Sequence, residues 1–250
     1  MENYIIPNWP APKNICAYST LRYHPLGKSV APYDNFNLAT YVGDNIDNVQ
    51  RNREILRKDL TLPQEPYWLK QEHTTNVIFI ETATQINEPI ADASYTAKEN
   101  IICAALTADC LPVLICDKSG SFVAAIHAGW KGLAAGVIEA AVNSIPIEKD
   151  KLMAWLGPAI GPKSFVVGDD VKQQFVNHDK KAAAAFIAKK APGKWFCDIY
   201  LLGKQRLHNT GVKEIYGGEF CTYSEPQKFY SFRRDNGATG RMATIIYKTS

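Results

Sequence analysis

Three polar residues lie in or beside segments that otherwise have the composition of buried strands. Cys110 belongs to the apolar segment 107–116, His127 ends the apolar run 121–127, and His73 lies between two further strand-like runs. Two imidazoles and one thiolate are a suitable ligand set for zinc, because they leave a fourth coordination position for water or substrate. These residue types predict either a catalytic metal site or a group of satisfied core residues.

The spacing of the three residues limits the kind of metal site. The separations along the chain are 37 residues (110 − 73) and 17 residues (127 − 110), which match no zinc finger. Only the tertiary structure can then assemble the site, as is usual for catalytic zinc. A second interpretation stays open, in which Cys110 is the nucleophile of a cysteine hydrolase and His127 is its base.

Composition restricts the class of protein. The chain has 250 residues, 46% hydrophobic and 21% charged, which is typical of a globular domain. A net charge of +3, with no block of Lys and Arg, predicts no nucleic-acid partner. The apolar segment 101–116 is too short to cross a bilayer, so no membrane association is expected. Six cysteines without a secretory signal at residues 1–10 predict a cytoplasmic protein. Composition gives no oligomeric state.

The elements that must position the three residues follow from hydrophobic periodicity. Helices are predicted at 47–60, from Trp130 to 145, and at 169–176, 181–189 and 198–208. Strands are predicted at 67–70 and 76–81, paired around His73, and at 101–106, 111–116, 121–127, 152–156, 229–232 and 242–248. Their irregular interleaving favours a layered, mixed-sheet α/β sandwich forming a single domain over residues 1–250.

Four ordered motifs carry a resemblance to a known family. They are Thr107-Ala-Asp-Cys-Leu-Pro-Val, His127-Ala-Gly-Trp-Lys-Gly, Trp155-Leu-Gly-Pro-Ala-Ile-Gly-Pro, and Cys221-Thr-Tyr together with Arg233-Arg-Asp. The chain resembles the bacterial laccase-domain proteins, once regarded as polyphenol oxidases and now as purine nucleoside enzymes. The resemblance extends over about residues 6–244, and it implies a layered α/β fold that also resembles the bacterial toxin deamidases with a Cys-His pair.

The resemblance also implies a site. His73, Cys110 and His127 match the three residues that bind one zinc ion in the family and act in catalysis. Two parts of the family pattern differ here: the segment Gln71-Glu-His-Thr replaces Gln-Val-His-Gly, and Arg22 is displaced within the N-terminal Ser-Thr-Arg motif. Arg22 is therefore only a substitute for the family's anion-binding arginine.

The activities implied are phosphorolysis of adenosine, inosine and methylthioadenosine, together with deamination of adenosine. The expected partners are a small nucleoside and phosphate, with Asn37, Lys131, Arg233 and Arg241 as substrate contacts. Arg234 is a further candidate for phosphate, since arginine binds it in a bidentate manner. For deamination, Asp109 and Glu72 are the candidate proton carriers. Asp109 is alternatively a residue that orients a ligand histidine.

Two other functions remain possible on the sequence. Cu²⁺ could occupy the same His₂Cys site, since it binds such ligands more tightly than Zn²⁺, and this would suit a polyphenol oxidase. Five histidines are too few for a trinuclear copper cluster with a separate blue-copper centre, so a single-chain multicopper oxidase is not expected. The remaining function is a cysteine hydrolase or amidase acting on a cell-wall precursor.

Overall fold

The computed structural model describes residues 3–250, whose strands form three sheets. The four-stranded sheet has the order β1 (Tyr4–Ile5), β2 (Ile15–Thr20), β13 (Met242–Lys248), β5 (Cys103–Thr107). The six-stranded sheet has the order β12 (Glu214–Gly217), β8 (Leu152–Leu156), β6 (Leu111–Asp117), β7 (Val123–Ala128), β4 (Ala93–Thr96), β3 (Val77–Phe79). The small sheet has the order β10 (Phe186–Ala188), β11 (Lys194–Cys197), β9 (Val166–Gly168). Parallel and antiparallel pairs occur together, so the fold is mixed α/β with several sheets.

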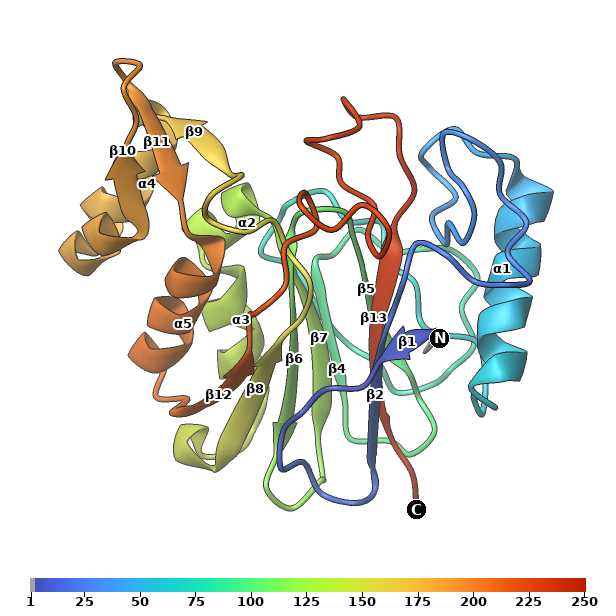
Figure 1. The fold of residues 1–250 in the computed structure, drawn as a ribbon. Coiled ribbons are helices and arrows are strands. Elements are labelled where there is room, and N and C mark those ends of the chain that lie inside the picture. Colours follow the sequence, from blue (N-terminus) through green and yellow to red (C-terminus); the bar gives the residue numbers. More distant parts are fainter. Residues whose placement is uncertain (1–2) are drawn as a thin grey trace.

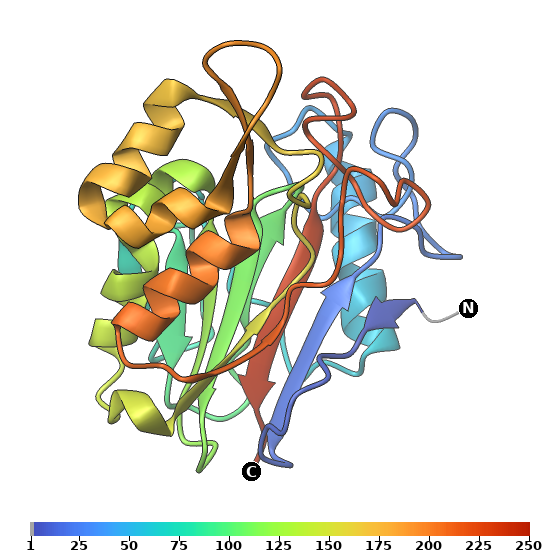
Figure 2. The ribbon, with the colours of Figure 1, turned by 60° about the vertical axis from the view of Figure 1, so that its left-hand side comes forward.

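Helices cover the outer faces of the two larger sheets, as Figure 1 shows. The helices are α1 (Ile46–Asp59), α2 (Trp130–Ala135), α3 (Val137–Ser144), α4 (Asp169–His178) and α5 (Ile199–Asn209), with 3₁₀ turns η1 (Lys149–Lys151) and η2 (Lys180–Ala185). α1 packs on the four-stranded sheet, whereas α3 and α5 pack on the six-stranded sheet (Figure 2). None of the helices within residues 3–250 is long and apolar enough to cross a membrane.

Alternating side chains of the central strands fill the two core regions on either side of the six-stranded sheet. In β6, Leu114 and Cys116 pack toward the four-stranded sheet, while Val113 and Ile115 pack toward the helices. Successive side chains of a strand point to opposite faces. Because both faces are buried, the strand has a nearly continuous apolar sequence rather than an alternating one.

Most predicted elements are confirmed, with bounds shifted by at most two residues. The helix predicted from Trp130 to 145 is divided at Gly136, which has φ +102° and ends α2 by donating its N–H to the carbonyls of Gly132 and Leu133. Glycine adopts this left-handed conformation without steric cost. The apolar period continues across the break and so conceals it.

Three predicted elements are wrong. The segment 181–189 is not a helix: it forms η2 and then β10, where Phe186 pairs with Cys197 and is buried in the core under the helices. Residues 67–70 do not pair with β3, which pairs with β4 instead. Residues 229–231 are irregular and residue 232 begins a turn, so no strand forms there. Each of these segments has the composition of its predicted element, but tertiary packing selected another conformation.

Candidate metal centre

The register of three neighbouring strands brings two of the predicted ligands to one end of the six-stranded sheet. β6 and β4 each run antiparallel to β7, with Leu111 opposite Ala128 and Ala93 opposite Ile126. The beginnings of β6 and β4 therefore flank the end of β7. Cys110 directly precedes β6, and His127 is the penultimate residue of β7.

His73 completes the group from the loop before β3. Its Nε2 atom lies 3.6 Å from the Cys110 Sγ atom, and its ring centroid lies 4.9 Å from that of His127. The nearest ligand atoms of all three residues lie within 4.8 Å of one another. With Zn–S near 2.3 Å and Zn–N near 2.05 Å, a tetrahedral ion separates its sulfur and nitrogen ligands by about 3.6 Å. The donor atoms thus fit a zinc-sized ion.

Asp92 holds both histidines in place. Its buried carboxylate accepts hydrogen bonds from His127 Nδ1 at 2.7 Å and from the backbone N–H of His73 at 3.0 Å. The N–H groups of Glu72 at 3.3 Å and Thr74 at 2.6 Å, and the Thr74 hydroxyl at 2.8 Å, donate to the same carboxylate. Three consecutive backbone N–H groups thus surround one anion, with His73 at φ +60°.

The same carboxylate fixes the tautomer of the predicted ligand His127. Because His127 Nδ1–H donates to Asp92, the Nε2 atom is left free as a donor to an ion. Burial raises the pKa of Asp92, but His127 and Thr74 outweigh this effect and hold it below its usual value. Sequence reasoning missed Asp92, since β4 was not predicted and no motif includes this residue.

Gly129 leaves the space that the ligands occupy. A Cβ atom at this position would lie 2.2 Å from Cδ2 and 2.4 Å from Nε2 of His73, and 3.0 Å from the Cys110 sulfur. Gly129 has φ −63°, which any residue can adopt, so its role is steric rather than conformational.

The thiol and the imidazole beside it change each other's protonation. Burial alone raises the pKa of Cys110, but the charges and hydrogen bonds of His127 and His73 lower it to about 6. Burial alone lowers the pKa of His127, but Cys110 and Asp92 raise it to about 9. A thiolate at neutral pH is both a metal ligand and a nucleophile.

The triad opens into a cavity of about 380 Å³, within the range of roughly 300–1,000 Å³ typical of small-molecule sites. Aromatic and aliphatic side chains form much of its wall: Leu106, Trp130, Ile160, Phe165, Ile199 and Phe232. Three cations expected from the sequence to contact substrate also line it, namely Lys131, Arg233 and Arg241. The cavity thus combines flat apolar surface with positive charge.

Asn37, the fourth predicted substrate contact, does not line this cavity. It is fully buried, its side-chain N–H groups donate to Ala39 O and Asp44 Oδ2, and its carbonyl accepts from Ala39 N and Arg241 N. All its hydrogen-bonding groups are used inside the protein. Its effect on the cavity is indirect, through the backbone of Arg241.

Two arginines considered for anion binding have structural roles. Arg22 donates to the carbonyls of Asp34 and Pro226 and packs over the ring of Tyr230. Arg234 pairs with Asp235 and donates to the carbonyls of Thr222 and Phe229. Neither guanidinium lines the cavity.

The two carboxylates considered as proton carriers are also engaged elsewhere. Glu72 pairs with Lys70 at 2.6 Å on the surface. Asp109 lines the cavity, but its two oxygens accept from Thr222 Oγ1 at 2.6 Å and from Arg233 N at 2.7 Å. Asp109 makes no hydrogen bond to a ligand histidine among the described residues; Asp92 has that role.

A multicopper site has no further ligands in the part of the chain that the structure describes. Within residues 3–250, the triad is the one group of three His, Cys or acidic residues close enough to share an ion. His24, for example, bonds Asp59 through Nε2 and accepts from the Leu26 N–H at Nδ1. The described residues therefore offer ligands for one ion and not for a trinuclear copper cluster, as the number of histidines predicts.

Comparisons with known proteins agree on one family. The family described as multi-copper polyphenol oxidoreductase laccase matches residues 17–249. The purine nucleoside phosphorylase YfiH of Escherichia coli K12 is 47% identical over 247 residues, covering 99% of each chain. A purine nucleoside phosphorylase of Haemophilus influenzae is 48% identical over 244 residues, covering 97% of this chain and 98% of its own.

Solved structures agree with the fold. Protein NMB0706 of Neisseria meningitidis superposes with a TM-score of 0.94 at 42% identity, over the whole of both chains. YlmD of Geobacillus stearothermophilus gives a TM-score of 0.93 at 26% identity, over 100% of this chain and 97% of its own. The layered arrangement of sheets and helices is thus shared.

Proposed function

The chain belongs to the laccase-domain family of purine nucleoside phosphorylases, and on this premise we propose that it is a metal-dependent purine nucleoside phosphorylase. The main support for this proposal is that one cavity contains a His₂Cys group able to bind a metal ion, apolar and aromatic walls, and three cationic side chains. Apolar walls suit a purine, and the cations suit phosphate. The expected substrates are adenosine, inosine and methylthioadenosine.

In phosphorolysis, a phosphate oxygen forms a bond to C1′ of the ribose while the C1′–N9 bond breaks. The electron pair leaves on the purine, which takes up a proton, and the sugar is released as ribose 1-phosphate or its methylthio analogue. We assign Lys131, Arg233 and Arg241 to the phosphate. Bidentate arginine contacts orient a phosphate oxygen as well as neutralise it. We assign Trp130, Phe165 and Phe232 to the faces of the base and sugar.

We further propose that zinc is the physiological ion and that the protein also deaminates adenosine. His73, Cys110 and His127 would hold the ion, and when bound it supplies a Lewis acid beside the substrate. Asp92 fixes the orientation of His127, and the apolar wall excludes bulk water from the reacting atoms. Deamination adds water at C6 and releases ammonia, so it needs no phosphate.

One assay separates these reactions. Zinc-loaded protein should release adenine and ribose 1-phosphate from adenosine only when phosphate is present, and inosine should form with or without it. Release of adenine at the same rate without phosphate would identify a nucleoside hydrolase instead. No turnover of any nucleoside would contradict the proposed function.

The lowered pKa of Cys110 favours a second candidate, a cysteine hydrolase with His127 as base. Cys110→Ala distinguishes the two: loss of both zinc and activity is expected of a ligand, whereas loss of activity with zinc retained would identify a nucleophile. A copper-dependent oxidase would instead consume dioxygen with phenols in proportion to the copper bound. The dioxygen measurement uses protein in which copper has replaced zinc.

A further inference from the structure

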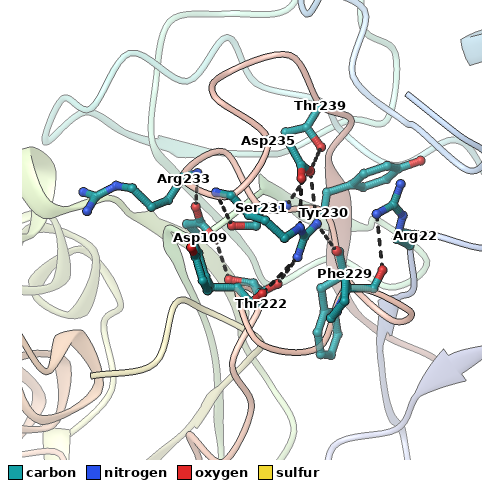
Figure 3. Close-up of polar contacts among 12 residues, drawn as sticks. Arg22, Asp109, Thr222, Phe229, Tyr230, Ser231, Arg233, Asp235 and Thr239 are labelled. Atoms are coloured by element: carbon teal, nitrogen blue, oxygen red, sulfur yellow. Dashed lines mark hydrogen bonds and ion pairs between the residues drawn. The ribbon is translucent and has the colours of Figure 1, made fainter. Parts of the chain in front are cut away.

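Asp109 connects the metal-binding strand to the cavity wall. It precedes Cys110 in the bend between β5 and β6, with φ +87°, and the residue is 9% exposed. Its carboxylate accepts from Thr222 Oγ1 at 2.6 Å and from Arg233 N at 2.7 Å, as Figure 3 shows. Its own carbonyl accepts from Ile160 N at 3.0 Å. An Asp tolerates the left-handed region better than most residues but not without cost, so these contacts must hold it there.

The segment 221–240 has no helix or strand, so polar contacts determine its shape. Arg234 donates to the carbonyls of Thr222 at 2.7 Å and Phe229 at 2.9 Å, and forms a bidentate pair with Asp235 at 2.8 and 3.0 Å. Thr239 Oγ1 donates to the same Asp235 carboxylate at 2.8 Å (Figure 3). The segment is therefore braced internally, and Asp109 attaches this braced unit to β6.

Arg233 projects from the braced unit toward the cavity. Its side chain extends away from the cluster in Figure 3, and its Nη1 atom donates to Val166 O at 2.8 Å above the ring of Phe165. Among the described contacts, none uses its Nε or Nη2 atoms. The N–H groups of Nε and Nη2, on one edge of the guanidinium, are therefore available to bind an anion. Their position depends on the Arg233 backbone, whose N–H group donates to Asp109.

We propose that Asp109 is a positioning residue that sets Arg233 for phosphate, rather than an acid or a base. The proposal rests on the proposed phosphorylase function and refines it. Because Asp109 and Cys110 are adjacent, one turn of the backbone fixes both the ion ligand and the phosphate contact. The distance between the ion bound by Cys110 and the phosphate bound by Arg233 would then depend on only a few covalent and hydrogen bonds.

Asp109→Asn tests the proposal with inorganic phosphate as the probe. The carboxamide has one oxygen for two donors: if that oxygen stays on Arg233 N, the Thr222 hydroxyl must turn and accept from the N–H₂ group, and in either orientation the negative charge that held both donors is lost. Because hydrogen bonds to a charged acceptor are stronger than those to a neutral one, we expect the KM for phosphate to rise roughly tenfold. The KM for adenosine, the kcat at saturating phosphate and the zinc content should change little.

A matched control lies at the other end of the same strand. Asp117→Asn makes the same chemical change in another carboxylate that accepts backbone N–H groups, outside the cavity. It should leave the KM for phosphate unchanged. In a double-mutant cycle, Asp109→Asn should add little in an Arg233→Gln background, because both changes remove the same contact.

Trypsin gives a structural readout that does not depend on activity. Without the Asp109 contact, trypsin should cleave after Arg233 several-fold faster in Asp109→Asn than in the wild-type protein. Under conditions where every variant stays folded, Asp117→Asn should show no such local increase. Equal cleavage in all three proteins would overturn the positioning role, even if phosphorolysis is established. Loss of zinc from Asp109→Asn would also overturn it, by showing that Asp109 acts on Cys110. Faster cleavage in a protein without phosphorylase activity would reject the proposed function and the assignment to phosphate.

Discussion

The carboxylate of Asp92 accepts five hydrogen bonds, and all of them act on the position of a histidine that we propose as a metal ligand. One goes to the His127 ring, and the others hold the backbone of His73 and its two neighbours. Asp92 therefore determines both the direction of one ligand and the loop conformation of another. Carboxylates that bond ligand histidines commonly tune affinity in this way.

Asp92→Asn tests this role. The carboxamide keeps the shape but presents N–H groups where backbone N–H groups also point, so the His73 loop should loosen. We expect zinc affinity to fall roughly 10–100-fold. Competition with a chromogenic chelator measures it. Unchanged affinity would show that the ligands are held without Asp92.

Gly129→Ala tests the steric space beside the ligands. Its methyl carbon would lie 2.4 Å from His73 Nε2, so the ring must move and the bound zinc should fall well below one per chain. Elemental analysis of the purified variant measures this. Gly132→Ala is a milder comparison, because its methyl carbon would lie 3.1 Å from Thr74 O, a tight contact that a shift of a few tenths of an ångström relieves, and would not touch the His73 ring. Full zinc occupancy in Gly129→Ala would contradict the assigned ligand geometry.

At the level of elements, the antiparallel register of β4, β7 and β6 assembles the site. The end of β7 lies between the beginnings of its two neighbours, so Asp92, His127 and Cys110 become adjacent although they are far apart in sequence. At the other end of β6, Asp117 closes the turn into β7. Its carboxylate accepts from Ser121 N and Phe122 N at 2.7 Å and from Ser119 N at 3.0 Å.

Asp117→Asn should destabilise the fold by about 1–3 kcal/mol at neutral pH, because an acceptor of several N–H groups becomes partly a donor. Burial raises the pKa of Asp117, but the bonds from Ser119, Phe122 and Ser121 outweigh it and lower the pKa below its ordinary value of 3.8. A carboxylate whose pKa is lower in the folded than in the unfolded state stabilises the fold at a pH above the unfolded-state pKa. This stabilisation is lost as the pH falls through the folded-state pKa.

The difference in unfolding free energy between wild-type and Asp117→Asn should therefore be largest near neutral pH and shrink below about pH 4. Urea denaturation at a series of pH values measures it. A difference that stays constant down to pH 3 would exclude a contribution from the ionised carboxylate.

For the whole molecule, an ion held by the triad would join the loop before β3, the start of β6 and the end of β7. Removing it should then lower the melting temperature. An ion at 100 times its Kd stabilises the folded state by about 2.7 kcal/mol, or roughly 5–10 °C for a chain of this length. Differential scanning fluorimetry before and after chelation measures the shift. Zinc should restore it and magnesium should not, since magnesium avoids thiolate ligands; no shift on chelation would count against a shared ion.

Local hydrophobic patterns in the sequence predicted most of the helices and strands but not the arrangement of side chains around the cavity. Runs such as 111–116 and 152–156 are apolar enough to specify buried strands, and the helical period specifies α1 and α5. Segment 181–189 has helical composition, but its second half, residues 186–188, pairs as a strand because burial of Phe186 outweighs local propensity. The kinship with toxin deamidases stays a prediction.

The sequence by itself determined the ligand candidates His73, Cys110 and His127, because residue type alone decides which side chains can bind zinc. It could not determine that Asp92 orients them, that Gly129 leaves room for them, or that Asn37, Arg22 and Arg234 are used inside the fold. Those roles depend on which donor meets which acceptor across strands and loops distant in the chain. Only strand register and loop packing fix such distances, and no local pattern encodes them.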